Sequence, residues 1–345
     1  MKYSVLEKLA AYNNDELFYR EYYQCRNQPQ KRKKLLSHIG TEDIHRRALL
    51  VAEVDDTFSI PFEMGEEIFY EKETQNICLS KHNRFTPEFL HSHTFFEIIY
   101  VLNGTCKHTI SGKEFLMPSG TLCIVAPHVY HAIGVFDDSI VLNILIRTST
   151  LEELYGSILK SDNPISTFLI HSIFSPEYDS FLQFHGESDD EIQHIILAMY
   201  QEQCDSGGYS EEIINHLMSI LLYRLVRSNQ IKTELSEMQI KKNEDATIYR
   251  YFWNHYHDAS LEELANILGY TSTYCSAYIK KTTGFTFSQL RKMILFRKAR
   301  ELLTHTSLSI QHISEHLGYR DSENFIRAFK KKFGVSPTQF RKSAL

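Results

Sequence analysis

Histidine and glutamate side chains gather in one short stretch of the sequence, in a pattern that suits ligand binding. His91, His93 and Glu97 are spaced so that on an extended strand all three side chains fall on one face. A fourth candidate, His131, follows a later series of turn signals. Imidazole and carboxylate groups bind zinc, iron and manganese. Convergent polar groups in a barrel mouth also bind small organic molecules. The pattern therefore predicts an effector site or a divalent metal site.

A second set of candidate functional side chains lies in an internal repeat near the C-terminus. Each copy has a short helical pattern, a Gly-aromatic turn and a longer helical pattern, and the offset is 49 residues at Gly269 and Gly318. On each longer helix, small, hydroxylic or charged residues lie opposite an apolar face, which suits insertion into a major groove of DNA. The candidate DNA-binding residues are Thr273, Ser276, Ala277, Lys280 and Lys281 in the first copy and Ser322, Glu323, Ile326, Arg327, Lys330 and Lys331 in the second.

Short strands must position the histidines. Between residues 76 and 148, β-rich runs alternate closely with turn signals such as Asn103-Gly104 and Ser111-Gly112. Turn signals at this density predict hairpins in a small antiparallel barrel or sandwich.

Helices must position the DNA-binding residues. We expect helix-turn-helix units at 261–282 and 310–333, joined by a continuous helix at 287–303. Gly269 and Gly318 should end the short helices, while Ser272 and Ser322 should cap the longer ones. The expected domains are a helical extension (1–75), the barrel (76–148), a helical dimerisation segment (149–229), a linker (230–244) and the DNA-binding domain (245–345).

Charge is unevenly distributed along the chain. From Lys241 onward there are 17 Lys and Arg against 9 Asp and Glu, whereas the preceding 240 residues carry a net charge of −14. An acidic body with a basic tail indicates that only the tail meets a polyanion. The sequence has no apolar run of membrane-spanning length, no secretory signal and no C-x-x-C pair among its six cysteines. We expect a cytoplasmic bacterial protein that has no membrane contact.

The repeat resembles the DNA-binding domain of the AraC/XylS family of transcription regulators. The resemblance rests on Leu264-Ala265, Leu268-Gly269-Tyr270, Phe325, Phe329-Lys330-Lys331 and the run from Gly334 to Arg341. It implies two recognition helices in successive major grooves, with the second copy nearer RNA polymerase. One departure is Phe287, where the family often has proline; the second copy keeps Pro337.

The histidine-rich stretch resembles the first cupin motif, H-x-H-x3-E-x6-G, from His91 to Gly104. The second cupin motif is only partly present, with His131 as its histidine. Cupin-like sensor barrels precede the DNA-binding domain in many AraC-type regulators. Three interpretations remain open for the cluster: a polar effector pocket without metal, a metal-bound sensor, and a purely structural hydrogen-bonded group.

Together these features predict an α+β chain with a cupin-like β-barrel, flanking helices and an all-α domain of two helix-turn-helix units. The predicted function is an AraC-type regulator that binds promoter DNA and is controlled by a small molecule, with carbohydrates implied by the family resemblance. We expect a homodimer, no catalytic residues and no obligatory cofactor. The alternative is a metal-dependent cupin enzyme with a DNA-binding appendage, which the H-x-H-x3-E pattern permits.

Overall fold

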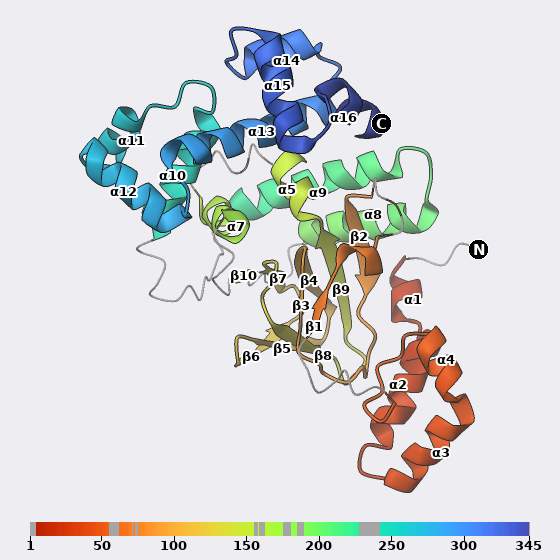
Figure 1. Cartoon of the computed structure of the whole chain (residues 1–345). Helices are drawn as coiled ribbons and strands as arrows, with labels where there is room; N and C mark the ends of the chain where they lie inside the picture. Colours follow the sequence, from red (N-terminus) through yellow and green to blue (C-terminus); the bar gives the residue numbers. More distant parts are fainter. Residues whose placement is uncertain are drawn as a thin grey trace. The chain divides into compact units, whose positions relative to one another are not determined.

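The computed structural model describes residues 5–54, 62–70, 72, 75–154, 158, 163–174, 181–184, 190–227 and 242–344. The chain divides into two compact units: Met1–Thr148 with Pro176–Glu234, and Ser149–Ser175 with Leu235–Leu345. In the described ranges the first unit contains strands and helices and the second only helices, which confirms the predicted fold class (Figure 1). No helix in these ranges combines the length and the apolar character needed to cross a membrane.

The strands of the first unit form two five-stranded sheets, in the orders β1-β3-β8-β5-β6 and β10-β7-β4-β9-β2. The pairings are antiparallel, except that β1 runs parallel to β3. The strands are β1 (Phe62–Met64), β2 (Ile77–Lys81), β3 (His91–His93), β4 (Phe96–Asn103), β5 (Thr105–Ile110), β6 (Lys113–Pro118), β7 (Leu122–Val125), β8 (His131–Gly134), β9 (Ile140–Ile146) and β10 (Phe181–Phe184).

Strand β4 is the central strand of its sheet and is buried along its whole length as far as Leu102. Apart from Glu97, its buried residues are apolar or aromatic on both faces, because both faces of the sheet are covered. The chain then turns into β5 through Gly104, which has a φ of +78°. A Cβ at this position would lie 2.0 Å from the Ser139 hydroxyl oxygen, so the turn requires glycine.

The segment 149–229 is less uniform than the single helical segment expected from the sequence. Its first helices, α5 (Thr148–Leu154) and α7 (Pro164–Phe174), group with the second unit. Strand β10 instead pairs with β7. A four-residue strand whose partner lies far along the chain has no local signature, because its hydrogen bonds exist only after folding.

Two long helices cover one edge of the β-structure: α8 (Asp190–Asp205) and α9 (Ser210–Arg227) pack together and against β2 (Figure 1). The Gln203 side chain of α8 accepts a hydrogen bond from the Leu79 N–H (2.7 Å) and donates one to the Leu79 carbonyl (2.6 Å). The amide thus replaces a neighbouring strand at the edge of the sheet, where unpaired backbone groups would otherwise remain.

The N-terminal extension has α-helices as far as Arg46 and a short 3-10 helix, η2 (Glu66–Ile68), after β1. Its α-helices are α1 (Val5–Ala10), α2 (Asn14–Gln24), α3 (Pro29–Ile39) and α4 (Thr41–Arg46). Asn13 caps α2 and forms a capping box with Glu16, which separates α2 from α1. Later in the region predicted to be helical, β1 joins the sheet beside β3. The extension therefore contributes both a small helical subdomain and part of the β-structure.

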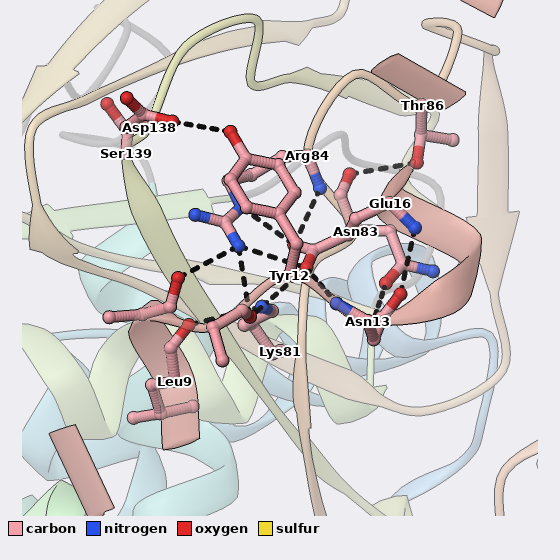
Figure 2. Close-up of polar contacts among 12 residues, drawn as sticks. Leu9, Tyr12, Asn13, Glu16, Lys81, Asn83, Arg84, Thr86, Asp138 and Ser139 are labelled. Atoms are coloured by element: carbon pink, nitrogen blue, oxygen red, sulfur yellow. Dashed lines mark hydrogen bonds and ion pairs between the residues drawn. The ribbon is translucent and has the colours of Figure 1, made fainter. Parts of the chain in front are cut away.

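A buried ion group, the Glu16 clamp, fixes the extension to the β-structure (Figure 2). We define the clamp as Glu16 on α2, Lys81 at the end of β2 and Arg84 just after it. Glu16 has no exposed surface, and its two carboxylate oxygens lie 2.9 Å from Arg84 Nε and 2.7 Å from Lys81 Nζ. The two cations also donate hydrogen bonds to backbone carbonyls at the end of α1, which the helix itself leaves unpaired: Leu9, Ala10 and Ala11.

Burial and hydrogen bonding have opposite effects on the pKa of Glu16. Burial favours the neutral acid and raises the pKa, but hydrogen bonds from Arg84 and Lys81 outweigh it and hold the pKa below the ordinary value of 4.5. The clamp is therefore ionised in the folded protein at neutral pH. The Arg84 guanidinium also stacks 3.6 Å from the centre of the Tyr12 ring, whose hydroxyl hydrogen-bonds Asp138.

The second unit places two similar helical units on either side of one long helix, α13 (Phe287–His305). The first consists of α11 (Leu261–Leu268) and α12 (Ser272–Thr283), and the second of α14 (Ile310–His316) and α15 (Ser322–Phe333). The remaining helices are α10 (Lys242–Asn254), which packs against α7, and α16 (Pro337–Ala344). The predicted linker at 230–244 lies mostly outside the described residues.

We expect Glu16→Gln to lower the free energy of unfolding by about 3–5 kcal/mol, because two buried cations lose their counter-charge. Urea unfolding of the full chain, followed by circular dichroism, measures this change. Since folding lowers the pKa of Glu16, its contribution is present above pH 4.5 and is lost as the pH falls through the folded pKa. The variant should lack this part of the acid dependence.

Glu21→Gln is the matched control, because Glu21 lies on the same helix and is exposed. Its effect should remain within about 0.5 kcal/mol. Equal stability of the two variants would show that the clamp does not hold the extension.

Candidate functional site

The histidines and the glutamate predicted from the sequence meet inside the β-structure. Strand β3 supplies His91 and His93, β8 supplies His131, and β4 in the facing sheet supplies Glu97. Glu97 Oε2 lies 3.4 Å from both His93 Nε2 and His131 Nε2. His91, Glu97 and His131 each offer a ligand atom, and these atoms lie within 4.8 Å of one another. His91, His93 and Glu97 were expected to share one face of a single strand. In the structure the site is formed instead by three strands from two sheets.

Backbone contacts fix the orientation of two imidazole rings. His91 Nδ1 lies 3.2 Å from the Phe89 carbonyl, and His93 Nδ1 lies 2.6 Å from the Phe95 carbonyl. A carbonyl only accepts hydrogen bonds, so in both rings Nδ1 carries a proton. His93 Nε2, His131 Nε2 and Glu97 Oε2 are buried and have no hydrogen-bond partner in the described chain.

Two further histidines belong to this group and were missed in the sequence. His108 on β5 contacts His131, with 3.0 Å between His108 Nε2 and His131 Nδ1. Burial lowers the pKa of His82, which follows β2, and the negative charge of Glu97 partly opposes this. His108 lies on an alternating strand and would have been found by extending the inward-facing pattern to β5. We refer to His82, His91, His93, Glu97, His108 and His131 as the histidine cluster.

Burial dominates the electrostatics of the histidine cluster. Burial lowers the pKa of His82 and of His108 to about 4 each, and it also lowers those of His91 and His131. These four rings are therefore neutral at pH 7 and can offer lone pairs. Burial raises the pKa of Glu97, but the contact with His93 more than offsets this and holds the pKa of the carboxyl below its ordinary value.

The histidine cluster can therefore bind a cation more readily than a bulky molecule. His91 is the most exposed of the four predicted ligands, at 8%, and His131 is fully buried. A tetrahedral ion with bonds of about 2.1 Å holds its ligand atoms about 3.4 Å apart. The two Nε2–Oε2 separations match this spacing. A larger organic ligand would have to displace the surrounding side chains.

The second candidate site is formed by the long helices of the repeat, α12 and α15. Their N-terminal caps are Thr271 and Asp321, each one residue before the predicted caps Ser272 and Ser322. The prediction of Ser272 and Ser322 was wrong because both residues already have helical geometry, and a cap must precede the first helical residue. The C-terminal caps are left-handed Gly284 and Gly334, with φ values of 73° and 78°.

Each of these helices buries one face and exposes the predicted DNA-binding face. Cys275, Ile279, Phe325 and Phe329 are buried, while Ser276, Ser322 and Ile326 are half-buried. The remaining predicted DNA-binding residues are exposed: Thr273, Ala277, Lys280 and Lys281 on α12, and Glu323, Arg327, Lys330 and Lys331 on α15. The geometry therefore leaves a polar and basic face free on each helix.

Two exposed side chains at equivalent positions of the repeat were not among the predicted contacts. Tyr274 on α12 is 54% exposed, and Asn324 on α15 is also exposed. Asn324 Oδ1 accepts a hydrogen bond of 2.8 Å from Arg327 Nη2, one helical turn away. The sequence could have pointed to Tyr274 and Asn324 through their position near the N-terminus of each helix, because that end of a recognition helix approaches the base edges.

Comparison with known proteins supports both parts of the chain. Residues 79–221 match an AraC-like ligand binding domain, and residues 264–343 match a helix-turn-helix domain. The HTH-type transcriptional activator RhaS of Escherichia coli O157:H7 (strain EC4115 / EHEC) is 24% identical over 255 residues, covering 73% of this chain and 86% of that protein. RhaS of Enterobacter sp. (strain 638) is 23% identical over 253 residues, with the same coverage.

Solved structures also match. The C-terminal domain of the response regulator yesN from Fusobacterium nucleatum is 31% identical, with 29% of this chain and 98% of that chain covered and a TM-score of 0.27. ToxT from Vibrio cholerae is 14% identical, with 78% and 98% covered and a TM-score of 0.30. With its duplicated helix-turn-helix units and both matched domains, the chain belongs to the AraC family of DNA-binding transcription regulators that carry an N-terminal ligand-binding domain.

Proposed function

We propose that α12 and α15 bind two major grooves of promoter DNA and read them by different chemistry. The observation that carries this proposal is that both helices expose a polar face opposite a buried one. On α15 the charged residues Glu323 and Arg327 suit hydrogen bonds with base edges. On α12 the small side chains of Thr273 and Ala277 suit methyl contacts and recognition of DNA shape. The lysines one turn later suit phosphates.

Binding to a duplex selected from a random library by the wild-type protein tests this proposal. Arg327→Ala should weaken binding by about 1–3 kcal/mol and relax the preference at one base pair. Lys330→Ala should weaken binding to all duplexes and reduce the salt dependence by about one charge. Lys113→Ala, an exposed lysine in the β5–β6 hairpin, is the control and should change nothing. Unaltered binding in both α15 variants would contradict the groove assignment.

We infer that the N-terminal unit is a sensor and that it has no catalytic role. The support is that its matched relatives are named transcriptional activators. In this proposal a small-molecule effector acts through the β-structure and shifts the DNA-bound population of the basic unit. The second helix-turn-helix unit would then lie nearest RNA polymerase, and the protein would act in the bacterial cytoplasm, where promoters are found.

As a second proposal, the histidine cluster binds a divalent metal ion. The residues fit such an ion because three imidazole rings and Glu97 Oε2 converge, and His93 Nε2, His131 Nε2 and Glu97 Oε2 are buried without a hydrogen-bond partner in the described chain. His108 would fix the orientation of the His131 ring through its contact with His131 Nδ1, leaving Nε2 directed at the ion. Metal-binding histidines are commonly held by a hydrogen bond to their other ring nitrogen. The ion would supply a fixed positive charge beside Glu97.

Metal analysis of the full chain after exposure to zinc, iron or manganese tests this second proposal. Wild-type protein should retain one ion per chain, and His108→Ala should weaken retention by about 10- to 100-fold. His128→Ala is the matched control, because His128 lies close in sequence to His131 but is exposed and pairs with Glu63. Wild-type protein that retains no ion would favour the metal-free effector pocket.

We also propose a homodimer formed through α9. Four residues of this helix, Ile213, His216, Ile220 and Tyr223, are exposed. Ile213, Ile220 and Tyr223 are 41%, 47% and 49% exposed, which is high for side chains of this size. Their alternating spacing of three and four residues is that of a coiled-coil seam. A seam of this kind on a single helix fits a second copy of the same helix related by two-fold symmetry.

Light scattering during size-exclusion chromatography measures the mass of the full chain. The wild-type protein should elute as a dimer and the Ile213→Glu/Ile220→Glu variant as a monomer, because the seam would then bury like charges. Leu116→Glu, at a residue of β6 that is 69% exposed, should remain dimeric. A monomeric wild type, or a dimeric double variant, would exclude this interface.

A further inference from the structure

A cleft of about 380 Å³ lies between helix α2 of the extension and the β-structure, apart from the histidine cluster. Its volume lies within the range of small-molecule sites. The lining includes three rings, Tyr23, Phe85 and Phe136, and three charged side chains, Arg26, Glu88 and Lys107. Helix α2 precedes the regions that match the two family domains, so one wall of this cleft is not part of the matched ligand-binding domain.

The three rings form a half-buried aromatic wall. Tyr23 stacks on Phe136, with 4.9 Å between ring centres and 17° between ring planes, and lies 5.7 Å from Phe85. All three rings keep part of their surface accessible. Aromatic surface in a concave site binds flat apolar groups by stacking and by burial of area. The wall therefore selects a planar or aromatic body.

Arg26 is the cationic group of the cleft that an anion can approach. Lys107 is instead paired with two carboxylates, because its Nζ lies 3.3 Å from Glu88 and 3.0 Å from Glu114. Arg26 is exposed, and its guanidinium carbon lies over the Tyr23 ring, 4.1 Å from the ring centre. In the described part of the chain no carboxylate lies within 4.0 Å of Arg26, whose guanidinium donates a hydrogen bond to the Tyr23 carbonyl. One guanidinium beside the rings is thus available for a single negative charge.

The floor of the cleft is held in place before any ligand arrives. Phe85 has a φ of +64°, a left-handed conformation that a phenylalanine rarely adopts. Its N–H donates to the Val135 carbonyl at 2.6 Å, and the preceding residue, Arg84, is fixed by Glu16. Strained backbone that the surroundings enforce is characteristic of ligand sites. Preorganisation of this kind reduces the entropy lost on binding.

We propose that this cleft binds a small aromatic carboxylate, with the ring against Tyr23 and Phe136 and the carboxylate on Arg26. The loop at its floor runs from His82 to His91, so it connects the cleft to the histidine cluster. Binding would favour the arrangement in which this loop and α2 are docked together. The site is distinct from the effector and metal sites proposed within the β-structure.

Isothermal titration calorimetry of the full chain with phenylacetate, 4-hydroxybenzoate and indole-3-acetate tests the proposal. At least one of these should bind the wild type, and its uncharged alcohol analogue should bind more weakly. Arg26→Gln should weaken binding by about tenfold or more, because a charge-assisted hydrogen bond is lost. Arg20→Gln is the matched control, since Arg20 lies on α2, shortly before Arg26 in the chain, and faces a different tyrosine ring, Tyr12, at 5.2 Å. It should bind like the wild type.

Three outcomes would overturn the proposal. The first is the absence of binding by all three carboxylates. The second is equal weakening by Arg20→Gln and Arg26→Gln, which would indicate a general effect of charge. The third is weakening by Glu97→Gln but not by Arg26→Gln, which would place the ligand at the histidine cluster. Thermal unfolding of each variant confirms that it is folded, and DNA binding by Arg26→Gln should equal that of the wild type.

Discussion

The ionised carboxylate of Glu16 is the constraint on which the architecture of the first unit depends. A buried charge is tolerated only when it is paired and hydrogen-bonded. Here one carboxylate faces two cations, and the excess positive charge is offset by backbone carbonyls at the end of α1. Glu16, Lys81 and Arg84 are all paired only when α1, α2 and the end of β2 lie together. It therefore couples the helical extension to the β-structure and makes any partial undocking costly.

The same clamp holds the loop that joins the two proposed ligand sites. Arg84 lies in this loop, which leads from β2 to β3, carries Phe85 to the cleft and ends at His91 in the histidine cluster. One end of the loop is held by an ion group and the other by pairing of His91 with His131 across β3 and β8. The two proposed sites are therefore joined by a short segment with two fixed ends. This gives a physical route by which a ligand could affect the extension.

The DNA-binding unit must hold two helices, α12 and α15, at a fixed spacing. Helix α13 begins at a capping box formed by Thr286 and Gln289, and the same two contacts recur between Ser336 and Gln339 in the second copy. The duplicated caps set equivalent helix starts. The aromatic core differs, because the second copy packs Phe325, Phe329 and Phe333 where the first has Cys275 and Ile279. The scaffold is thus repeated while the exposed faces remain free to diverge.

The sequence by itself determined the helix-turn-helix duplication, the presence of β-hairpins between residues 76 and 148 and the identity of four residues in the histidine cluster, because these depend on local periodicity, glycine geometry and motif spacing. It did not reveal β10, His82, His108, the pairing of Glu16 with Arg84 or the aromatic cleft. Each of these joins residues far apart in the chain. Only the tertiary structure decided them. Buried charges need partners because the interior has low polarity, and that interior exists only once the chain has folded. The same is true of the pairing of distant strands.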